Sequence, residues 1–224
     1  MNLQRHCLSL ALVSITSLCV AQAANGATIL VFGQNGTAQT VTATTNGAQT
    51  QTTISGSDIA VTLTALENGA PGTQAFLDFT FTSTGAASTN MGNIDQNYSG
   101  VFTITSTAAP GGVNYLSGNF SDLASGSIGG NQLTVGAGTP SDVVNFTSSV
   151  ITSLNLERSL SIAFTNVIPA LAICNTTLCG FAASVAGNFS ANLPVTVPEP
   201  ASLLLFGTAL ASLAASRRLR RGRQ

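Results

Sequence analysis

The sequence predicts an all-β protein whose body is a single antiparallel domain, a β-sandwich or a barrel-like fold, followed by one C-terminal hydrophobic helix. Three observations predict it. Apolar residues alternate with Thr, Ser and Asp in several short segments, clusters of Gly, Asn, Pro and Ser separate these segments, and no stretch before residue 198 has helical periodicity. The domain, residues 24–197, is long enough to form one hydrophobic core.

Composition narrows the classes of protein to which the chain can belong. Its 224 residues include 7 basic and 8 acidic residues but no Lys, beside 22 Gly, 29 Thr and 24 Ser. So few charges exclude an ordinary cytosolic enzyme, in which about a quarter of the residues are charged. Residues 24–197 contain seven acidic residues and one basic residue, Arg158, which gives this segment a formal charge of −6. We therefore expect no nucleic-acid partner.

The first 23 residues have the three parts of a secretory signal peptide. Arg5 supplies the positive charge, residues 8–20 are largely apolar, and Ala21 and Ala23 form a small-x-small cleavage site before Ala24. The apolar run is shorter than the roughly 20 residues that span a bilayer. We therefore expect this segment to be removed from an exported protein.

Period-2 alternation predicts four half-buried strands in the domain, each with a polar side rich in Thr. Because the chain has no Trp, we expect the ten Phe of the domain to fill much of the core, each contributing about 1.5–3 kcal/mol when buried. The apolar sides of the four strands are Ile59, Val61, Leu63 and Ala65; Leu77, Phe79 and Phe81; Phe102 and Ile104; and Leu160, Ile162 and Phe164.

Clusters rich in Gly, Asn, Pro and Ser separate the predicted strands, and we expect turns at each of them. Within them, residues 86–93 are expected to be disordered because small and polar residues dominate the segment. The clusters span residues 68–72, 85–93, 109–114, 126–131 and 136–141.

Two cysteines remain after the signal peptide, Cys174 and Cys179. An exported protein meets an oxidising compartment, so we expect a disulfide that closes this short loop. Half of a metal site is the alternative, but the mature chain has neither a His nor a second Cys pair to complete tetrahedral coordination. No metal ion or cofactor is therefore expected, and the disulfide should stiffen a loop more than it supports the fold.

Candidate catalytic groups are scarce. His6 is the only histidine and belongs to the signal peptide, which excludes Ser-His-Asp and Cys-His mechanisms and leads us to expect no enzymatic activity. A glycosidase would need two carboxyl groups about 5–10 Å apart in one cleft. The acidic residues are dispersed along the sequence and are expected to be solvated: Asp58, Asp78, Asp95, Asp122, Asp142 and Glu157.

Two patterns are candidates for ligand binding. Asn93, Asp95 and Asn97 place oxygen atoms two residues apart, as calcium loops do, but they lack the charge and the distant bidentate Glu of such loops. Thr-x-Thr runs also recur. If their strands are neighbours, the hydroxyl and methyl groups form a ladder that can bind glycan or ice; otherwise the runs only reflect the strand propensity of Thr on a solvated face. The runs are Thr40-x-Thr42-x-Thr44, Thr62-x-Thr64, Thr80-x-Thr82 and Thr103-x-Thr105.

The C-terminus contains a helix breaker, an apolar helix and a basic stop, in that order. Pro198-Glu199-Pro200 precedes the uncharged residues 201–216, which would span about 24 Å as a helix. That length suits a thin bilayer. Positive residues stay on the cytoplasmic side, so the domain should face outward. The basic residues of the stop are Arg217, Arg218, Arg220, Arg221 and Arg223.

This tail, VPEP followed by ASLLLFGTALASLAAS and RRLRRGR, closely resembles the PEP-CTERM sorting tail of exported proteins in Gram-negative bacteria. The resemblance implies a substrate of an exosortase, a membrane enzyme that acts near the motif Pro198, Glu199 and Pro200. The segments VFGQNGTAQTVT and NYLSGNFSDLA also resemble a β-rich body that recurs in such proteins, which brings no known active site.

The resemblance further implies a role at the cell surface, because the family is associated with species that make exopolysaccharide or biofilm. We therefore expect a non-enzymatic surface or matrix protein, anchored in the inner membrane before processing and then released to the cell surface or the extracellular space. Its expected partners are the exosortase, the inner membrane and an extracellular polysaccharide. The alternative is a binding module for glycan or ice that uses a Thr-rich sheet face.

Overall fold

The computed structural model describes residues 26–108, 111–154 and 157–191, and within these ranges the chain forms strands and no helix. The all-β prediction is confirmed. The strands are β1 (Ala27–Gln34), β2 (Val41–Thr45), β3 (Thr52–Leu66), β4 (Thr73–Ser83), β5 (Ser88–Asn90), β6 (Asn93–Thr105), β7 (Asn114–Ser127), β8 (Leu133–Gly138), β9 (Val143–Thr147), β10 (Arg158–Ile168), β11 (Ile173–Cys174), β12 (Thr177–Leu178) and β13 (Phe181–Ala191).

The predicted signal peptide, C-terminal hydrophobic helix and sorting tail lie outside the described residues. Within residues 26–108, 111–154 and 157–191, no helix has the length and apolarity needed to cross a bilayer.

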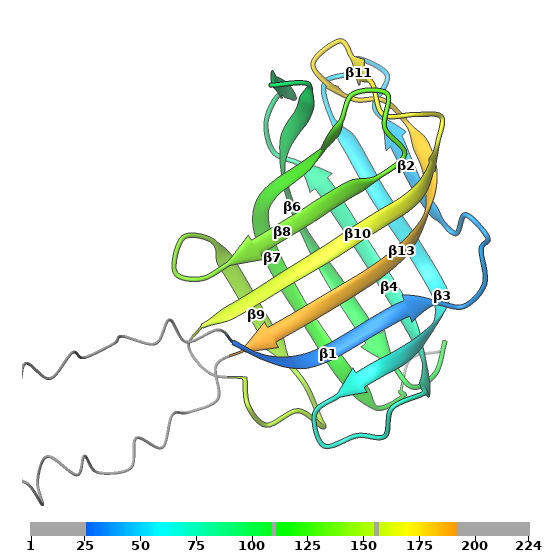
Figure 1. Cartoon of the computed structure of the whole chain (residues 1–224), viewed down its shortest axis with the longest axis vertical. Helices are drawn as coiled ribbons and strands as arrows, with labels where there is room; N and C mark the ends of the chain where they lie inside the picture. Colours follow the sequence, from blue (N-terminus) through cyan, green and yellow to red (C-terminus); the bar gives the residue numbers. More distant parts are fainter. Residues whose placement is uncertain (1–25, 109–110, 155–156, 192–224) are drawn as a thin grey trace, which may run out of the picture.

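Eight of the strands close into an antiparallel barrel. Their order is β1-β3-β4-β6-β7-β8-β10-β13, and β13 pairs with β1 to complete the ring. In Figure 1, β1, β13, β10 and β8 form a front wall, and β3, β4, β6 and β7 form a back wall behind them. Of the two architectures that the sequence predicts, the barrel-like one is therefore correct.

Three short strands extend the wall where longer strands stop. β2 lies beyond β1 and pairs with the same neighbours, β3 and β13. β9 follows β8 and pairs with β7, and β5 follows β4 and pairs with β6. The prediction of disorder at residues 86–93 is wrong, because β5 lies within this segment and its backbone pairs with β6 through Thr89 and Ile94.

The barrel interior is filled with apolar side chains, as the alternation predicts. Every residue assigned to an apolar strand side is buried except Ala65, because a register shift between Val31 and Phe32 of β1 brings Leu66 inward in its place. Nine of the ten Phe of the domain are buried. The exception is Phe76 of β4, which lies on the outer side and is partly exposed.

Glycines at inward positions make room for the aromatic rings. Gly100 of β6 lies opposite Phe81, and Gly118 of β7 lies opposite Phe102. A Cβ atom at Gly118 would clash with the backbone carbonyl oxygen of Asn145 and stand 3.1 Å from the Phe102 ring. A Phe on one strand thus faces a Gly on the next strand, which lets the aromatic rings pack inside a narrow barrel.

A disulfide-closed hairpin, β11 and β12, caps one end of the barrel. Cys174 and Cys179 are bonded to each other, as the sequence predicts. Thr177 and Leu178 between them are fully buried. The Gln96 side chain of β6 donates to Thr177 Oγ1 at 2.8 Å and accepts from the Leu178 backbone N–H at 3.0 Å. The disulfide therefore closes a segment that is packed into the barrel end, not a loop that lies on the surface.

The first residue of β1 and the last residue of β13 lie side by side, at the end of the barrel opposite the disulfide hairpin. Ala27 pairs with Ala191, the last residue of β13. Phe181, at the start of β13, pairs with β2 near the hairpin, and the 11 residues of β13 span about 35 Å. Both Ala27 and Ala191 therefore lie at the end away from the disulfide (Figure 1).

Candidate functional site

Three groups of predicted site residues lie outside the described residues and stay predictions. They are the sorting motif Pro198, Glu199 and Pro200; the basic stop Arg217, Arg218, Arg220, Arg221 and Arg223; and the cleavage-site residues Ala21 and Ala23. The candidate site that the structure does describe lies on the outer surface formed by β2, β3, β4, β6, β7 and β9. We call this surface the hydroxyl face.

Strand register brings most of the Thr-x-Thr runs into common rows on this face. Thr103 lies in a neighbouring row opposite Asp78, whereas Thr62 and Thr64 lie further along β3, where Thr62 donates a hydrogen bond to Asn35. The strands that carry the runs are thus neighbours. One row contains Thr42, Ser55, Thr80, Val101, Asn119 and Asn145, and the next contains Thr44, Thr53, Thr82, Ser99, Ser121 and Val143.

Many hydroxyl groups on the hydroxyl face are available to a ligand. Within the described ranges, the side chains of Thr44, Thr80 and Thr82 make no hydrogen bond to other protein groups. Cross-strand pairing of side chains occurs at the β7–β9 edge, where the hydroxyl groups of Ser117 and Thr147 lie 2.8 Å apart. The face therefore offers donors and acceptors in rows, one strand spacing of about 4.8 Å apart.

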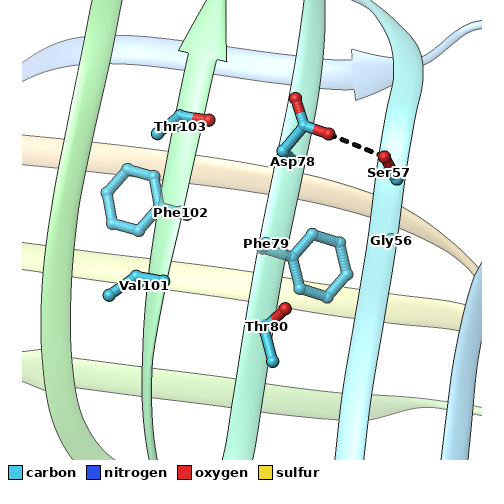
Figure 2. A pocket seen from close by; sticks show the side chains of 8 residues that line it. All are labelled: Gly56, Ser57, Asp78, Phe79, Thr80, Val101, Phe102 and Thr103. Carbon is cyan, nitrogen blue, oxygen red and sulfur yellow. Dashed lines mark hydrogen bonds between the residues drawn. The ribbon is translucent and has the colours of Figure 1, made fainter.

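A hollow opens on the hydroxyl face beside these rows. Figure 2 shows its first part, of about 230 Å³, in which Asp78 of β4 lies between Thr103 of β6 and Ser57 of β3. A second part, of about 370 Å³, shares these three residues. Its volume falls in the range of about 300–1,000 Å³ that is usual for small-ligand pockets. The second part is lined further by Asp58, Thr105, Thr107, Ala108 and Gly111.

A β-bulge in β3 shapes the hollow. Ser57 and Asp58 together lie opposite Asp78, because the pairing of β3 with β4 shifts between Gly56 and Ile59. Asp78 Oδ1 accepts hydrogen bonds from the Ser57 hydroxyl at 3.0 Å and from the Asp58 backbone N–H at 2.8 Å. Asp58 has a φ of 52°, a left-handed conformation that Asp adopts more readily than most residues. The bulge thus fixes Asp78 and places the exposed Asp58 at the rim.

The structure brings four of the acidic residues, which are dispersed along the sequence, into two pairs. Asp58 and Asp78 line the same hollow. Burial, and to a lesser extent the nearby Asp142 carboxyl group, raises the pKa of Asp122, although a hydrogen bond from the Leu123 backbone N–H lowers it. Asp142 also accepts the Gly138 backbone N–H at 2.8 Å. The second pair therefore joins Asp122 of β7 to Asp142 in the turn between β8 and β9.

The stretch with calcium-loop spacing is part of strand β6. Residues two apart in a strand are separated by about 7 Å, which leaves Asn93 and Asn97 about 13 Å apart. They cannot both reach one ion at the Ca²⁺–oxygen distance of about 2.3–2.6 Å. Asp95 Oδ1 instead accepts the Ser125 hydroxyl at 2.6 Å. Among the described residues, no three His, Cys, Asp or Glu side chains gather where they could hold a metal ion.

Sequence reasoning missed Phe76 and the bulge. Phe76 precedes Leu77, whose inward position follows from its spacing to Phe79, so strand parity was a signal that Phe76 points outward. Gly56 inside an otherwise regular strand pattern was a signal for the bulge. Nothing in the sequence pattern pairs the bulge with Asp78, since that contact joins residues of different strands.

Comparisons with known proteins concern the tail. Residues 196–221 match the PEP-CTERM protein-sorting motif, which confirms the resemblance based on the Pro-Glu-Pro sequence, the apolar segment and the Arg residues. The motif marks the chain as an exported protein that passes through the membrane and is processed by an exosortase, a membrane sorting enzyme. No curated protein and no solved structure matches the chain.

Proposed function

We propose that this PEP-CTERM protein is a non-enzymatic component of the cell surface or the extracellular matrix, connected with exopolysaccharide or biofilm. It is exported behind residues 1–23, held in the inner membrane by residues 201–216, and cleaved near Pro198-Glu199-Pro200. The observation that carries the proposal is the sorting motif at residues 196–221, which follows closely on the last strand of the barrel.

The geometry of the barrel supports this arrangement. The chain leaves β13 at Ala191, at the end opposite the disulfide hairpin. A barrel tethered there directs its hairpin end away from the membrane and leaves the hydroxyl face accessible along its side. The acidic charge of residues 24–197 opposes contact of the barrel with anionic lipid.

Intact-mass measurement tests the processing. From cells with the exosortase, we expect a released protein that lacks residues 1–23 and the residues after the motif. From cells without the exosortase, we expect a membrane-bound chain that keeps its tail. Recovery of the full-length chain from the cytosol, or an unchanged destination after deletion of residues 201–216, would contradict the proposal.

The state of the acidic pair in the hollow supports a non-enzymatic role. Asp78 Oδ1 is already occupied by the Ser57 hydroxyl and the Asp58 backbone N–H, and the Asp58 side chain is exposed. Incubation with oligosaccharides should therefore leave their length unchanged, and the appearance of shorter products would refute this part of the proposal.

A second function, ligand binding by the hydroxyl face, is favoured by one observation. Strand register places Thr42, Ser55 and Thr80 in one row and Thr44, Thr53 and Thr82 in the next. Such a face suits a glycan or ice. Thermal hysteresis and glycan retention separate the two ligands, because only an ice-binding face arrests the growth of ice crystals. A protein that does neither lacks this function.

A further inference from the structure

We propose that the hollow around Asp78, together with Phe76 beside it, is a binding site for an uncharged polysaccharide. One sugar residue occupies the hollow, and the neighbouring sugars lie along the rows of the hydroxyl face. This inference rests on the second function above and identifies its ligand as a glycan.

The form of the site suits a chain molecule. The two parts of the hollow meet at Asp78, and the rows of hydroxyl groups begin at Thr80, the next outward residue of β4. The hollow is open on the outer surface of a sheet, so a polymer can continue past it on both sides. Its second part, of about 370 Å³, is large enough for a small ligand.

The polar groups of the hollow match the hydroxyl groups of a sugar. Oδ1 of Asp78 is held by Ser57 and Asp58, while Oδ2 makes no hydrogen bond within the described residues. A carboxylate oxygen that accepts a hydroxyl group forms a short, charge-assisted hydrogen bond. On the other side of Asp78, the Thr103 hydroxyl group likewise makes no hydrogen bond within the described residues. Because the bulge already fixes Asp78, binding does not have to order it.

Apolar contacts lie on both sides of Asp78 along the strands. Phe76 is the preceding outward residue of β4, one row from Asp78. Val101 of β6 lies opposite Thr80, one row further on, and is 57% exposed. These rows are about 7 Å apart. A pyranose presents C–H groups on its ring faces, which are attracted to the negative face of an aromatic ring, so the partly exposed Phe76 provides a stacking surface in a chain without Trp.

Charge selects against an anionic polysaccharide. Asp58 and Asp78 both lie at the hollow, and Arg158 is the only basic residue of residues 24–197. Its guanidinium group donates to the backbone carbonyls of Leu154 and Val144, near the start of β10. An anionic chain would therefore meet carboxylates without a compensating cation. The hollow and its carboxylates also bound the hydroxyl rows on one side, which limits the flat surface that ice binding would need.

Affinity electrophoresis with the protein as cells export it tests the proposal. Native gels contain dextran, galactomannan or xyloglucan as uncharged probes and alginate as the anionic probe. We expect retardation by at least one uncharged polysaccharide and none by alginate. Phe76→Ala and Asp78→Asn should each weaken this binding by about tenfold or more. Asn keeps the oxygen that accepts from Ser57 and Asp58, so Asp78→Asn should preserve the bulge.

Two control variants separate the site from a general change of surface. Asp95→Asn makes the same change of charge on the outer side of β6, about 27 Å along the strand from Thr103. Thr134→Ala removes an outward hydroxyl group from the front wall. Both should bind within about twofold of the unchanged protein, and melting curves should show that Phe76→Ala and Asp78→Asn remain folded.

Each other outcome overturns the proposal in a distinguishable way. Glycan binding that is unaffected by Phe76→Ala and Asp78→Asn would reject this site but retain ligand binding by the hydroxyl face. If Asp95→Asn weakened polysaccharide binding as much as Asp78→Asn does, the effect would come from the change of net charge and not from this site. Arrest of ice growth without glycan retention would favour the ice form of the second function. Retardation by none of the uncharged polysaccharides, with no effect on ice, would reject the inference and the second function together.

Discussion

Phe76 and Phe79 lie three residues apart on β4 but belong to two different regions of the protein. Phe79 is buried inside the barrel, with its ring centroid 4.7 Å from that of Phe81 and 5.8 Å from that of Phe164. Phe76 lies outside, one row from Asp78 on the hydroxyl face. The same residue type thus supports the core in one place and is partly exposed on the outer surface in the other. Whether a Phe points into the barrel or outward is decided by its position in the two-residue alternation of the strand, and not by composition.

The outer surfaces of the two walls show the same principle. On the front wall, Gly33, Ala186 and Ala163 lie in one row across β1, β13 and β10. On the hydroxyl face, the corresponding outward positions of neighbouring strands carry Thr and Ser. The front wall carries hydroxyl residues as well, such as Thr134, which continues this row on β8, so the difference between the two walls is one of degree.

The largest expected effect comes from placing a charge on each side of β4. Phe79→Asp buries an unpaired carboxylate among aromatic rings and removes packing worth about 3–5 kcal/mol, a large part of the stability of a domain. We expect it to unfold the protein, whereas Phe76→Asp should remain folded. Circular dichroism melts of both variants provide the test. A cooperative transition in Phe79→Asp would show that the inner and outer sides are assigned wrongly.

Much of the division of strand residues into inward and outward positions could be predicted from the sequence. The alternation in residues 59–63, 77–81 and 160–164 identifies inner positions correctly, because a half-buried strand has a period of two. Prediction failed where the period breaks. Because the pairing register shifts at Val31, Leu66 points into the barrel where the alternation predicts Ala65. The bulge at Ser57 and Asp58, which shapes the hollow, also lies outside the simple alternation.

The candidate site was less predictable than the fold for a related reason. Its contacts join residues distant in sequence, such as Ser57 to Asp78 and Asp78 to Thr103, and they depend on register between strands. A single sequence fixes parity within one strand but not the alignment of one strand with another. The Thr-x-Thr runs were therefore visible, whereas the rows they form were not.

A smaller effect is expected from adding one methyl group on either side of the wall. Gly118→Ala places a Cβ against the backbone of Asn145 and the rings of Phe102 and Phe146 inside the barrel, where overpacking costs about 1–3 kcal/mol. Gly33→Ala adds the same group on the outer side, where no atom of the described residues, apart from its chain neighbours, lies within 4 Å. Urea titration should show a clear loss of stability for the first and almost none for the second. Equal midpoints would contradict the close packing at Gly118.

The hairpin end offers the same comparison for a buried and an exposed hydroxyl group. Thr177 Oγ1 lies 2.7 Å from the hydroxyl oxygen of Thr52 and accepts from Gln96, whereas Thr176 is exposed. Thr177→Val leaves a buried Gln96 N–H without a partner, at a cost of about 1–3 kcal/mol. Thr176→Val should cost less than about 0.5 kcal/mol. Thermal melts that rank the two variants in the opposite order would show that the hairpin is not anchored by this network.

The smallest expected effect concerns Asp122, a carboxyl group at an inward position of β7 between the buried Phe120 and Ala124. Burial and the neighbouring Asp142 raise its pKa in the folded protein, while in the unfolded chain the pKa is about 3.9. Between these two values the folded state binds more protons, so the free energy of unfolding falls as the pH rises through this window. At neutral pH the folded protein carries the whole penalty of the charged form.

Asp122→Asn removes that penalty and supplies an amide N–H group that can donate to Asp142. We expect the variant to melt at a higher temperature than the unchanged protein at pH 7, with the difference shrinking as the pH is lowered below about 4, where both forms of residue 122 are uncharged. Asp95→Asn, on the outer side of β6, should give no such gain because Asp95 accepts a hydrogen bond from Ser125. If Asp122→Asn instead melted at a lower temperature at pH 7, the Asp122 carboxylate would be a stabilising group. The inward position of residue 122 in β7 would then not imply that its charge is buried.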